Sequence, residues 1–241
     1  MSQPHAALGR QVVAEGLGTA LLVAVVVGSG IAAQRLSPGQ TGLQLLENSL
    51  ATGAGLVALI LAFGSVSGAH FNPVVSLVDG FLGGLGWAAV LAYIGAQVVG
   101  ACVGCMAANL MFDLDAVTLS TTTRSSGGIW LAEAVATFGL ILVILGLART
   151  GRAALAPFAV AAYITAAYWF TLSTSFANPA VTVGRMLTDT FAGIAPGSVP
   201  AFVAFQLIGG ALAVAVSLFL HPDLDPDDVV VPHEPAPGAL P

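Results

Sequence analysis

Two Asn-Pro pairs bring polar side chains into otherwise apolar stretches of this sequence. Each opens the same six-residue pattern of Asn, Pro, small apolar, Val, hydroxyl and aliphatic residues, which reads Asn72-Pro73-Val74-Val75-Ser76-Leu77 and Asn178-Pro179-Ala180-Val181-Thr182-Val183. Proline suits the first position of a helix, and an asparagine before it can cap the free N–H groups of the first turn. The pattern therefore predicts two short helices whose amino ends carry amide side chains.

The composition is that of a membrane protein. Of 241 residues, 57 % are hydrophobic and only 7 % are charged, against about 25 % charged in soluble domains. A helix needs roughly 20 mainly apolar residues to cross a bilayer, and six stretches meet this requirement: Gln11–Ala33, Leu45–Val66, Trp87–Leu110, Ile129–Ala148, Ala153–Ser173 and Val199–Leu220. An even number of spans puts both ends of the chain on one side of the membrane.

The stretches that follow the Asn-Pro pairs are too short to cross the membrane. Pro73–Gly80 and Pro179–Leu187 would reach only about 12–14 Å at 1.5 Å per helical residue. Non-helical backbone at membrane depth is tolerated only where protein buries it or where it lines a water-filled cavity. The approach segments 64–71 and 174–177 therefore predict a cavity, with a half-helix entering from each.

The chain carries an internal repeat, at about 11–110 and 129–220. Glu15 in the first span matches Glu133 in the fourth, and Gln97 in the third matches Gln206 in the sixth. Three spans per repeat is an odd number, so the two halves must be inserted in opposite directions. The half-helices are then expected to enter from opposite faces and to meet near the midplane.

The paired half-helix ends predict a preference for uncharged solutes. Each amino end acts like about +0.5 charge, so a cation between them is repelled from both sides. Asn72 and Asn178 are expected to tie their carbonyl oxygens to backbone N–H groups and to offer NH₂ donors to the lumen.

Several ionisable residues are candidate site residues. A carboxylate in a membrane span marks function by default, so Glu15 and Glu133 either couple transport to protons or accept hydrogen bonds from the irregular approach segments; we favour the second role. His70 is expected to line the lumen, with capping of a turn as the alternative. Asp79 and Arg185 each follow their Asn by seven residues, which predicts corresponding places at the two opposite mouths.

The pattern resembles the aquaporin, or major intrinsic protein, family over essentially Gln11–Leu220. Ser67-Gly68-Ala69-His70-Phe71-Asn72-Pro73-Val74-Val75 is similar to the first signature loop of the family, and Asn178-Pro179-Ala180 to the second. The resemblance implies an all-α fold of six transmembrane helices and two re-entrant half-helices. It also implies a homotetramer with one pore per subunit, in the cell membrane with cytoplasmic termini.

The selectivity filter departs from the family pattern. The arginine that normally stands three residues after the second Asn is replaced by Val181. Counting without gaps, the other filter positions fall on Thr52, Ala166 and Ser175, with Tyr163 or Ala167 as alternatives to Ala166. We therefore predict a wide, uncharged filter, unless Arg185 reaches back from one turn beyond Val181.

With valine at the arginine position, the sequence is most similar to the bacterial aquaporins associated with arsenic resistance. This resemblance implies passage of neutral arsenite and methylated arsenicals. Water and polyols such as glycerol are expected to pass as well. A water-selective channel and a proton-coupled carrier are the alternatives. An enzyme is not expected, because no Ser/His or metal-ligand cluster converges in the predicted lumen; no cofactor or metal is implied.

The ends of the chain are predicted to lie outside the channel. Residues 1–10 form a short N-terminal segment, 11–220 the channel domain, and 221–241 an acidic, proline-rich tail expected to be disordered. The net charge of −6 argues against a nucleic-acid partner, which leaves lipid, small neutral solutes and further copies of the chain.

Overall fold

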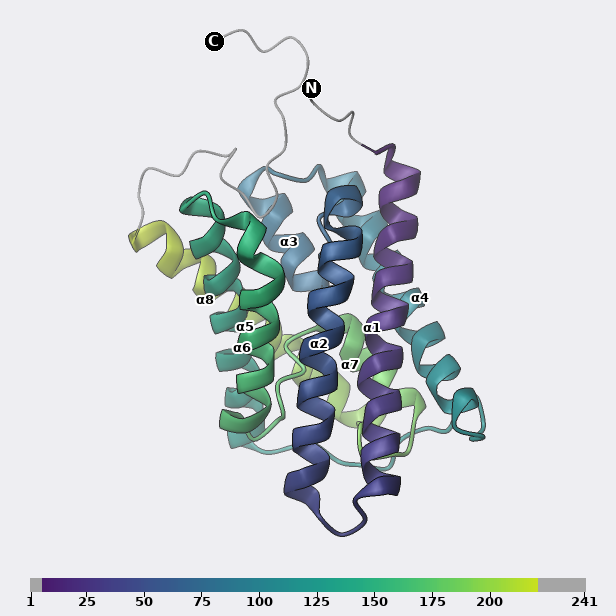
Figure 1. Ribbon diagram of the computed structural model, residues 1–241. Coiled ribbons are helices and arrows are strands. Elements are labelled where there is room, and N and C mark those ends of the chain that lie inside the picture. The colour runs from purple at the N-terminus through teal and green to yellow at the C-terminus, as the bar shows by residue number, and fades with distance from the viewer. Residues whose placement is uncertain (1–5, 221–241) are drawn as a thin grey trace, which may run out of the picture.

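The computed structural model describes residues 6–220, and every regular element in this part is helical (Figure 1). The long helices are α1 (Leu8–Leu36), α2 (Thr41–Ser67), α4 (Trp87–Met111), α5 (Gly127–Arg149), α6 (Ala156–Phe170) and α8 (Val199–Leu220). Two short helices, α3 (Pro73–Leu82) and α7 (Pro179–Gly184), follow the Asn-Pro pairs. The predicted fold class, with six membrane-length helices and two half-helices, is confirmed. The proposed tail 221–241 lies outside the described residues.

The two halves of the chain run in opposite directions. In Figure 1, α3 lies in the upper half of the molecule and α7 in the lower half, while α1 and α2 run most of its height. Helix α1 packs against α4 and α5 packs against α8, and each half-helix contacts both α4 and α8. This arrangement brings the amino ends of α3 and α7 together at mid-height.

Glycines allow the long helices of each repeat to cross closely. A Cβ atom on Gly100 would lie 2.2 Å from the carbonyl oxygen of Gly16, and one on Gly209 would lie 2.2 Å from that of Ala134. Real Cβ atoms do not approach a backbone oxygen so closely, so both positions require glycine. These matching contacts hold α4 against α1 in the first repeat and α8 against α5 in the second.

The fifth span ends earlier than the sequence predicts. Helix α6 stops at Phe170, and Thr171 turns to an extended conformation with ψ of 135°. The irregular approach to the half-helix therefore covers 171–178 in the second repeat but only 68–72 in the first. This difference in length changes which residues of α6 face the interior.

Candidate functional site

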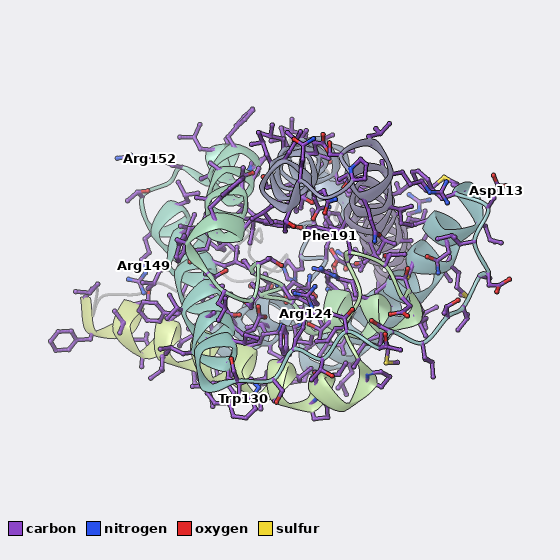
Figure 2. All side chains as sticks on the ribbon, turned by 90° about the horizontal axis from the view of Figure 1, so that it is seen from below. Asp113, Arg124, Trp130, Arg149, Arg152 and Phe191 are labelled. Atoms are coloured by element: carbon purple, nitrogen blue, oxygen red, sulfur yellow. The ribbon has the colours of Figure 1, made fainter. Side chains whose placement is uncertain are left out.

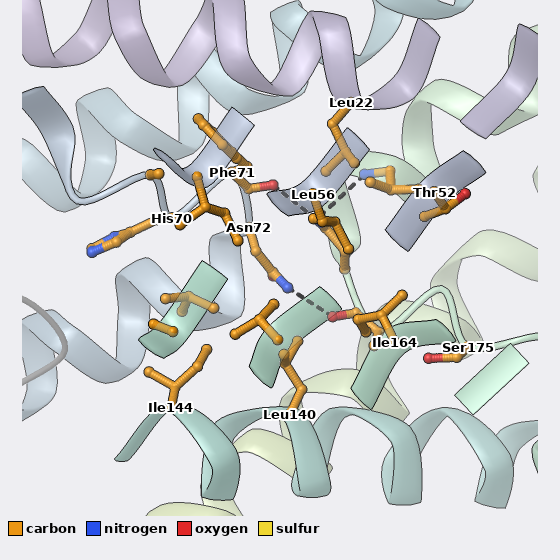
Figure 3. Close-up of a pocket in the computed structure, with 18 of the residues that line it drawn as sticks. Leu22, Thr52, Leu56, His70, Phe71, Asn72, Leu140, Ile144, Ile164 and Ser175 are labelled. Carbon is orange, nitrogen blue, oxygen red and sulfur yellow. Dashed lines mark hydrogen bonds between the residues drawn. The ribbon is translucent and has the colours of Figure 1, made fainter. Parts of the chain in front are cut away.

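A cavity of about 100 Å³ lies between the two repeats. Its wall is mostly apolar, with matching pairs of side chains from α1 and α5, namely Leu22 and Val26 with Leu140 and Ile144. Seven polar or charged side chains interrupt this wall: Thr52, His70, Asn72, Tyr168, Ser175, Asn178 and Arg185. Figure 3 shows Asn72 between the side chains of Leu22 and Leu56 and those of Leu140 and Ile144.

The two asparagines cap the half-helices and tie the repeats together. Asn72 Oδ1 accepts from the N–H of Val74 at 3.0 Å, and Asn178 Oδ1 accepts from that of Ala180 at 3.0 Å. The Nδ2 of Asn72 donates to the carbonyl of Ala177, and the Nδ2 of Asn178 to that of Phe71, each at 2.8 Å (Figure 3). An amide NH₂ has two N–H donors, so one on each asparagine remains for a solute.

The approach loops use an unusual backbone at equivalent positions. Ala69 and Phe71 in the first loop have φ of 50° and 48°, and Ser175 and Ala177 in the second have φ of 51° and 48°. Left-handed φ is uncommon for residues other than glycine and costs of the order of 1–3 kcal/mol where neighbours enforce it. Something in each repeat must therefore hold the loop in place.

In the first repeat, Glu15 holds the loop. Its carboxylate accepts from the N–H of His70 at 2.9 Å, the N–H of Phe71 at 2.7 Å and the hydroxyl of Ser67 at 2.6 Å. The amide of Gln97 donates to the same carboxylate at 2.8 Å and to the Ser76 hydroxyl at 2.9 Å. Glu15 is fully buried and does not line the cavity.

The second repeat copies this network. Glu133 accepts from the N–H groups of Phe176 and Ala177, each at 2.9 Å, and from the amide of Gln206 at 2.5 Å. Gln206 also donates to the hydroxyl of Thr182 at 2.9 Å. Thr182 and Ser76 are the hydroxyl residues of the six-residue pattern, so the repeated hydroxyl connects each half-helix to its glutamine.

Three of the four predicted filter residues line the cavity. Thr52, Ser175 and Val181 face it and are at most 5 % exposed. The Ser175 hydroxyl makes no hydrogen bond to the described residues, which leaves it available to a solute. The Val181 side chain adds no charge at the arginine position.

The fourth filter residue was assigned wrongly. Ala166 is exposed on the outside of α6, and the cavity face of this helix carries Val160, Ile164 and Tyr168 at four-residue spacing. The alternatives Tyr163 and Ala167 do not line the cavity either. The ungapped count failed because the helix ends at Phe170, before the long approach loop.

Tyr168 therefore adds an aromatic ring that the sequence analysis missed. Its hydroxyl lies 3.1 Å from Thr52 Oγ1, across the interface of α6 and α2. This bond ties the ring to the wall on the α2 side. The four-residue spacing from Ile164 was the signal that could have identified Tyr168.

The three remaining candidates have different surroundings. His70 lines the cavity, with Nδ1 3.0 Å from Ser76 Oγ. Asp79 is fully buried, does not line the cavity and lies 3.5 Å from His70 Nε2, so its predicted place at a mouth is wrong. Its side chain turns inward toward the loop that precedes its own half-helix. Arg185 does line the cavity and is 2 % exposed.

Six membrane-length helices around a lined cavity, with two capped half-helices meeting beside it, define a transmembrane channel. The comparisons agree with this class of protein. The family model of the Major intrinsic protein matches residues 2–175. Aquaglyceroporin AqpS of Rhizobium meliloti is 51 % identical over 213 residues, covering 88 % of this chain and 91 % of the relative.

Two further matches are more distant. Aquaporin NIP2-2 of Zea mays is 34 % identical over 199 residues, which cover 79 % of this chain and 65 % of the maize protein. The X-ray structure of the aquaglyceroporin from Plasmodium falciparum superposes with a TM-score of 0.70 at 19 % identity, over 90 % of this chain and 98 % of the other. At that identity the structural match supports the fold alone.

The chain belongs to the major intrinsic protein family. It is a multi-pass membrane protein and a channel for water and small solutes, not an enzyme.

Proposed function

We propose that this channel passes small uncharged solutes passively, with arsenous acid as the leading substrate, and that water, glycerol and methylated arsenicals also pass. The main support for this proposal is that an uncharged side chain, Val181, lines the cavity three residues after Asn178. The name of the Rhizobium relative, an aquaglyceroporin, supports passage of solutes larger than water.

The polar groups of the wall suit a neutral solute that carries hydroxyl groups. The free N–H of each asparagine amide donates, and the Ser175 hydroxyl both donates and accepts. Between these groups the wall is apolar, so it supplies no compensation for the lost hydration of an ion. Arsenous acid and glycerol both present three hydroxyl groups without charge, which fits a few polar contacts in an apolar wall.

A water-selective channel is the second candidate, because two observations favour it. The Arg185 side chain lines the cavity, and the Tyr168 ring faces the same space. Together they would narrow the passage that the small Val181 side chain leaves wide. Selective water flux without solute entry would then follow.

A proton-coupled carrier has less support. Glu15 and Glu133 are fully buried behind the cavity wall, and both carboxylates accept hydrogen bonds from the approach loops. A coupling carboxylate must exchange its proton with the lumen, whereas these serve as loop supports.

We further propose a homotetramer in the cell membrane, with both termini in the cytoplasm. The charges leave the orientation open, since Arg10, Arg149 and Arg152 belong to one end of the molecule and Arg35, Arg124 and Arg185 to the other. The proposal therefore rests on the family resemblance. Blue-native electrophoresis of protein crosslinked in its membrane tests the tetramer, and protease access to a C-terminal tag in sealed vesicles tests the orientation.

Reconstitution into liposomes tests the proposed function. Arsenite content is assayed directly in filtered vesicles, and glycerol entry is followed by light scattering, each against protein-free vesicles. The proposal predicts faster entry of both solutes, with the same final content whether or not a pH gradient is imposed. Accumulation above the outside concentration would indicate the carrier, and water flux without solute entry would indicate the water-selective channel.

A further inference from the structure

Two arginines contact one aromatic ring at the lower mouth of the cavity. The guanidinium carbon of Arg185 lies 3.5 Å from the centroid of the Phe176 ring, and that of Arg124 lies 5.2 Å from it. Both distances are within the range of a cation–π interaction. Two positively charged guanidinium groups therefore contact the one Phe176 ring, although their residues are 61 positions apart in the sequence (185 minus 124).

The same loop holds both guanidinium groups through its carbonyl oxygens. Arg185 Nε donates to the carbonyl of Ala192 at 2.5 Å, and Arg124 Nε donates to that of Gly193 at 2.9 Å. Arg124 also donates to the carbonyl of Phe191 at 3.3 Å. Figure 2, which looks at this face from below, shows Arg124 and Phe191 near its middle and Asp113 at its edge.

No carboxylate of residues 6–220 pairs with either guanidinium. Asp189, the acid on the same loop, is turned to Thr121, from which it accepts N–H and hydroxyl hydrogen bonds at 2.8 and 3.0 Å. Glu133 is occupied by the approach loop. Burial lowers the pKa of Arg124 in the α4–α5 loop, against the opposing influence of Glu133 and Tyr168. Among the described residues, the groups in direct contact with the two guanidinium groups are therefore neutral, and the charge of Glu133 acts on them only from a distance.

An unpaired buried charge is costly, so its retention points to a function. Arg185 and Phe176 both line the cavity, and Arg185 is only 2 % exposed. A purely structural clamp between the α7 segment and the 188–195 loop would not need a permanent charge on the cavity wall. The stacking on Phe176 and the Ala192 carbonyl fix where that charge stands.

We propose that Arg185, positioned by Phe176 and reinforced by Arg124, is the residue that excludes cations from this channel. Val181 leaves the filter uncharged, and the guanidinium of Arg185, which directly follows the end of α7, supplies the missing positive charge outside it. Selection by size and selection by charge are thereby separated, because Val181 determines how large a solute can pass and Arg185 determines which charge is excluded. This inference rests on the proposed passive channel for neutral solutes.

Proton and sodium leak through proteoliposomes tests the proposal. A fixed potassium diffusion potential drives the cations, and internal pH-sensitive and sodium-sensitive dyes report their entry. The variants are Arg185→Met, which keeps an unbranched side chain without charge, and Arg185→Lys, which keeps the charge. Arg152→Met is the matched control, since Arg152 is an exposed arginine on the α5–α6 turn.

Arg185→Met is expected to raise cation leak about tenfold or more, because a fixed charge about 6–12 Å from the path changes an ion's rate by about one to two orders of magnitude at an effective dielectric near 20. Water flux should stay within about twofold of the unmodified protein, and Arg185→Lys should leak much less than Arg185→Met. Arg152→Met should not leak. Arg124→Gln should give a smaller rise than Arg185→Met.

Two outcomes would overturn the proposal. Arg185→Met with normal water flux and no added leak would mean that the half-helix ends alone exclude cations. Equal leak of Arg185→Met and Arg185→Lys would mean that packing, not charge, is responsible. Should Arg185→Met fail to reconstitute, Arg185→Gln removes the same charge while keeping an N–H donor for the Ala192 carbonyl, and an absence of added leak in that variant would reject the proposal. Neutral-solute uptake is measured separately, so failure of the proposed function is recognised independently.

Discussion

Replacement of Glu133 by glutamine should destabilise the second approach loop and the channel with it. The carboxylate accepts from the N–H groups of Phe176 and Ala177 and from the amide of Gln206, at 2.9, 2.9 and 2.5 Å. Glutamine offers one carbonyl oxygen in place of two carboxylate oxygens. Its NH₂ group would then face at least one of these three donors.

The expected cost follows from these contacts. A buried donor left without an acceptor costs about 1–3 kcal/mol, and the surviving bonds weaken because charge-assisted hydrogen bonds are roughly twice as strong as neutral ones. The total for Glu133→Gln is about 2–4 kcal/mol. At about 2–4 °C per kcal/mol for a chain of this size, the melting temperature should fall by about 4–16 °C.

The assay is thermal unfolding of purified protein, with water flux in proteoliposomes as a second readout. Thr137→Val is the matched control, since Thr137 lies one turn away on α5, is fully buried, and its hydroxyl makes no hydrogen bond to the described residues. The control should melt within a few degrees of the unmodified protein. A Glu133→Gln protein as stable as the control, with unchanged water flux, would refute the loop-supporting role.

Three further predictions concern packing, pH and the filter. Gly209→Ala should destabilise the protein by about 1–3 kcal/mol because the new Cβ would lie 2.2 Å from a backbone oxygen of α5. The control Gly95→Ala, with open space around its Cβ, should be neutral or slightly stabilising. Thermal melts of the two variants, run in parallel, compare these effects. Hydrogen bonds from Thr121 hold the pKa of Asp189 below its ordinary value. The ionised carboxylate therefore stabilises the fold above a pH of about 3.9, and this stabilisation is lost as the pH falls through the lower, folded-state pKa. Asp189→Asn should narrow the difference in stability between neutral and acid melts, and an unchanged acid dependence would contradict this. Tyr168→Ala should raise glycerol entry relative to water in stopped-flow measurements, since it removes the aromatic ring of the filter layer, and lower glycerol entry would show that the ring orders the path.

Features fixed by local pattern and repetition were predictable from the sequence. The half-helix starts at Pro73 and Pro179, the six spans and the inverted order of the halves follow from proline chemistry, apolar length and an odd number of spans. The pairing of each glutamate with an irregular loop could be anticipated because each repeat holds one of each.

Features that depend on register and side-chain direction were not predictable. The count to Ala166 assumed an ungapped loop before Asn178, but α6 ends at Phe170 and Tyr168 faces the cavity instead. Asp79 was assigned to a mouth by its distance along the chain, whereas its side chain turns inward to His70. Sequence spacing gives the position of a Cα atom but not the rotation of a helix against its neighbours.

Contacts between distant loops were also hidden from sequence reasoning. The two arginines meet Phe176 because the α4–α5 loop and the 188–195 loop fold over the same mouth. No local pattern links Arg124 to Arg185.

The most direct test of the wide filter is to restore an arginine at position 181. Water, glycerol and arsenite permeabilities are measured on the same reconstituted preparations of the unmodified protein and of Val181→Arg, with Val181→Leu as the uncharged control for added bulk. The account predicts that Val181→Arg loses glycerol and arsenite entry while water flux remains, because a guanidinium narrows and charges the wall at that point. Glycerol and arsenite entry left unchanged by Val181→Arg, or absent from the unmodified protein, would contradict it.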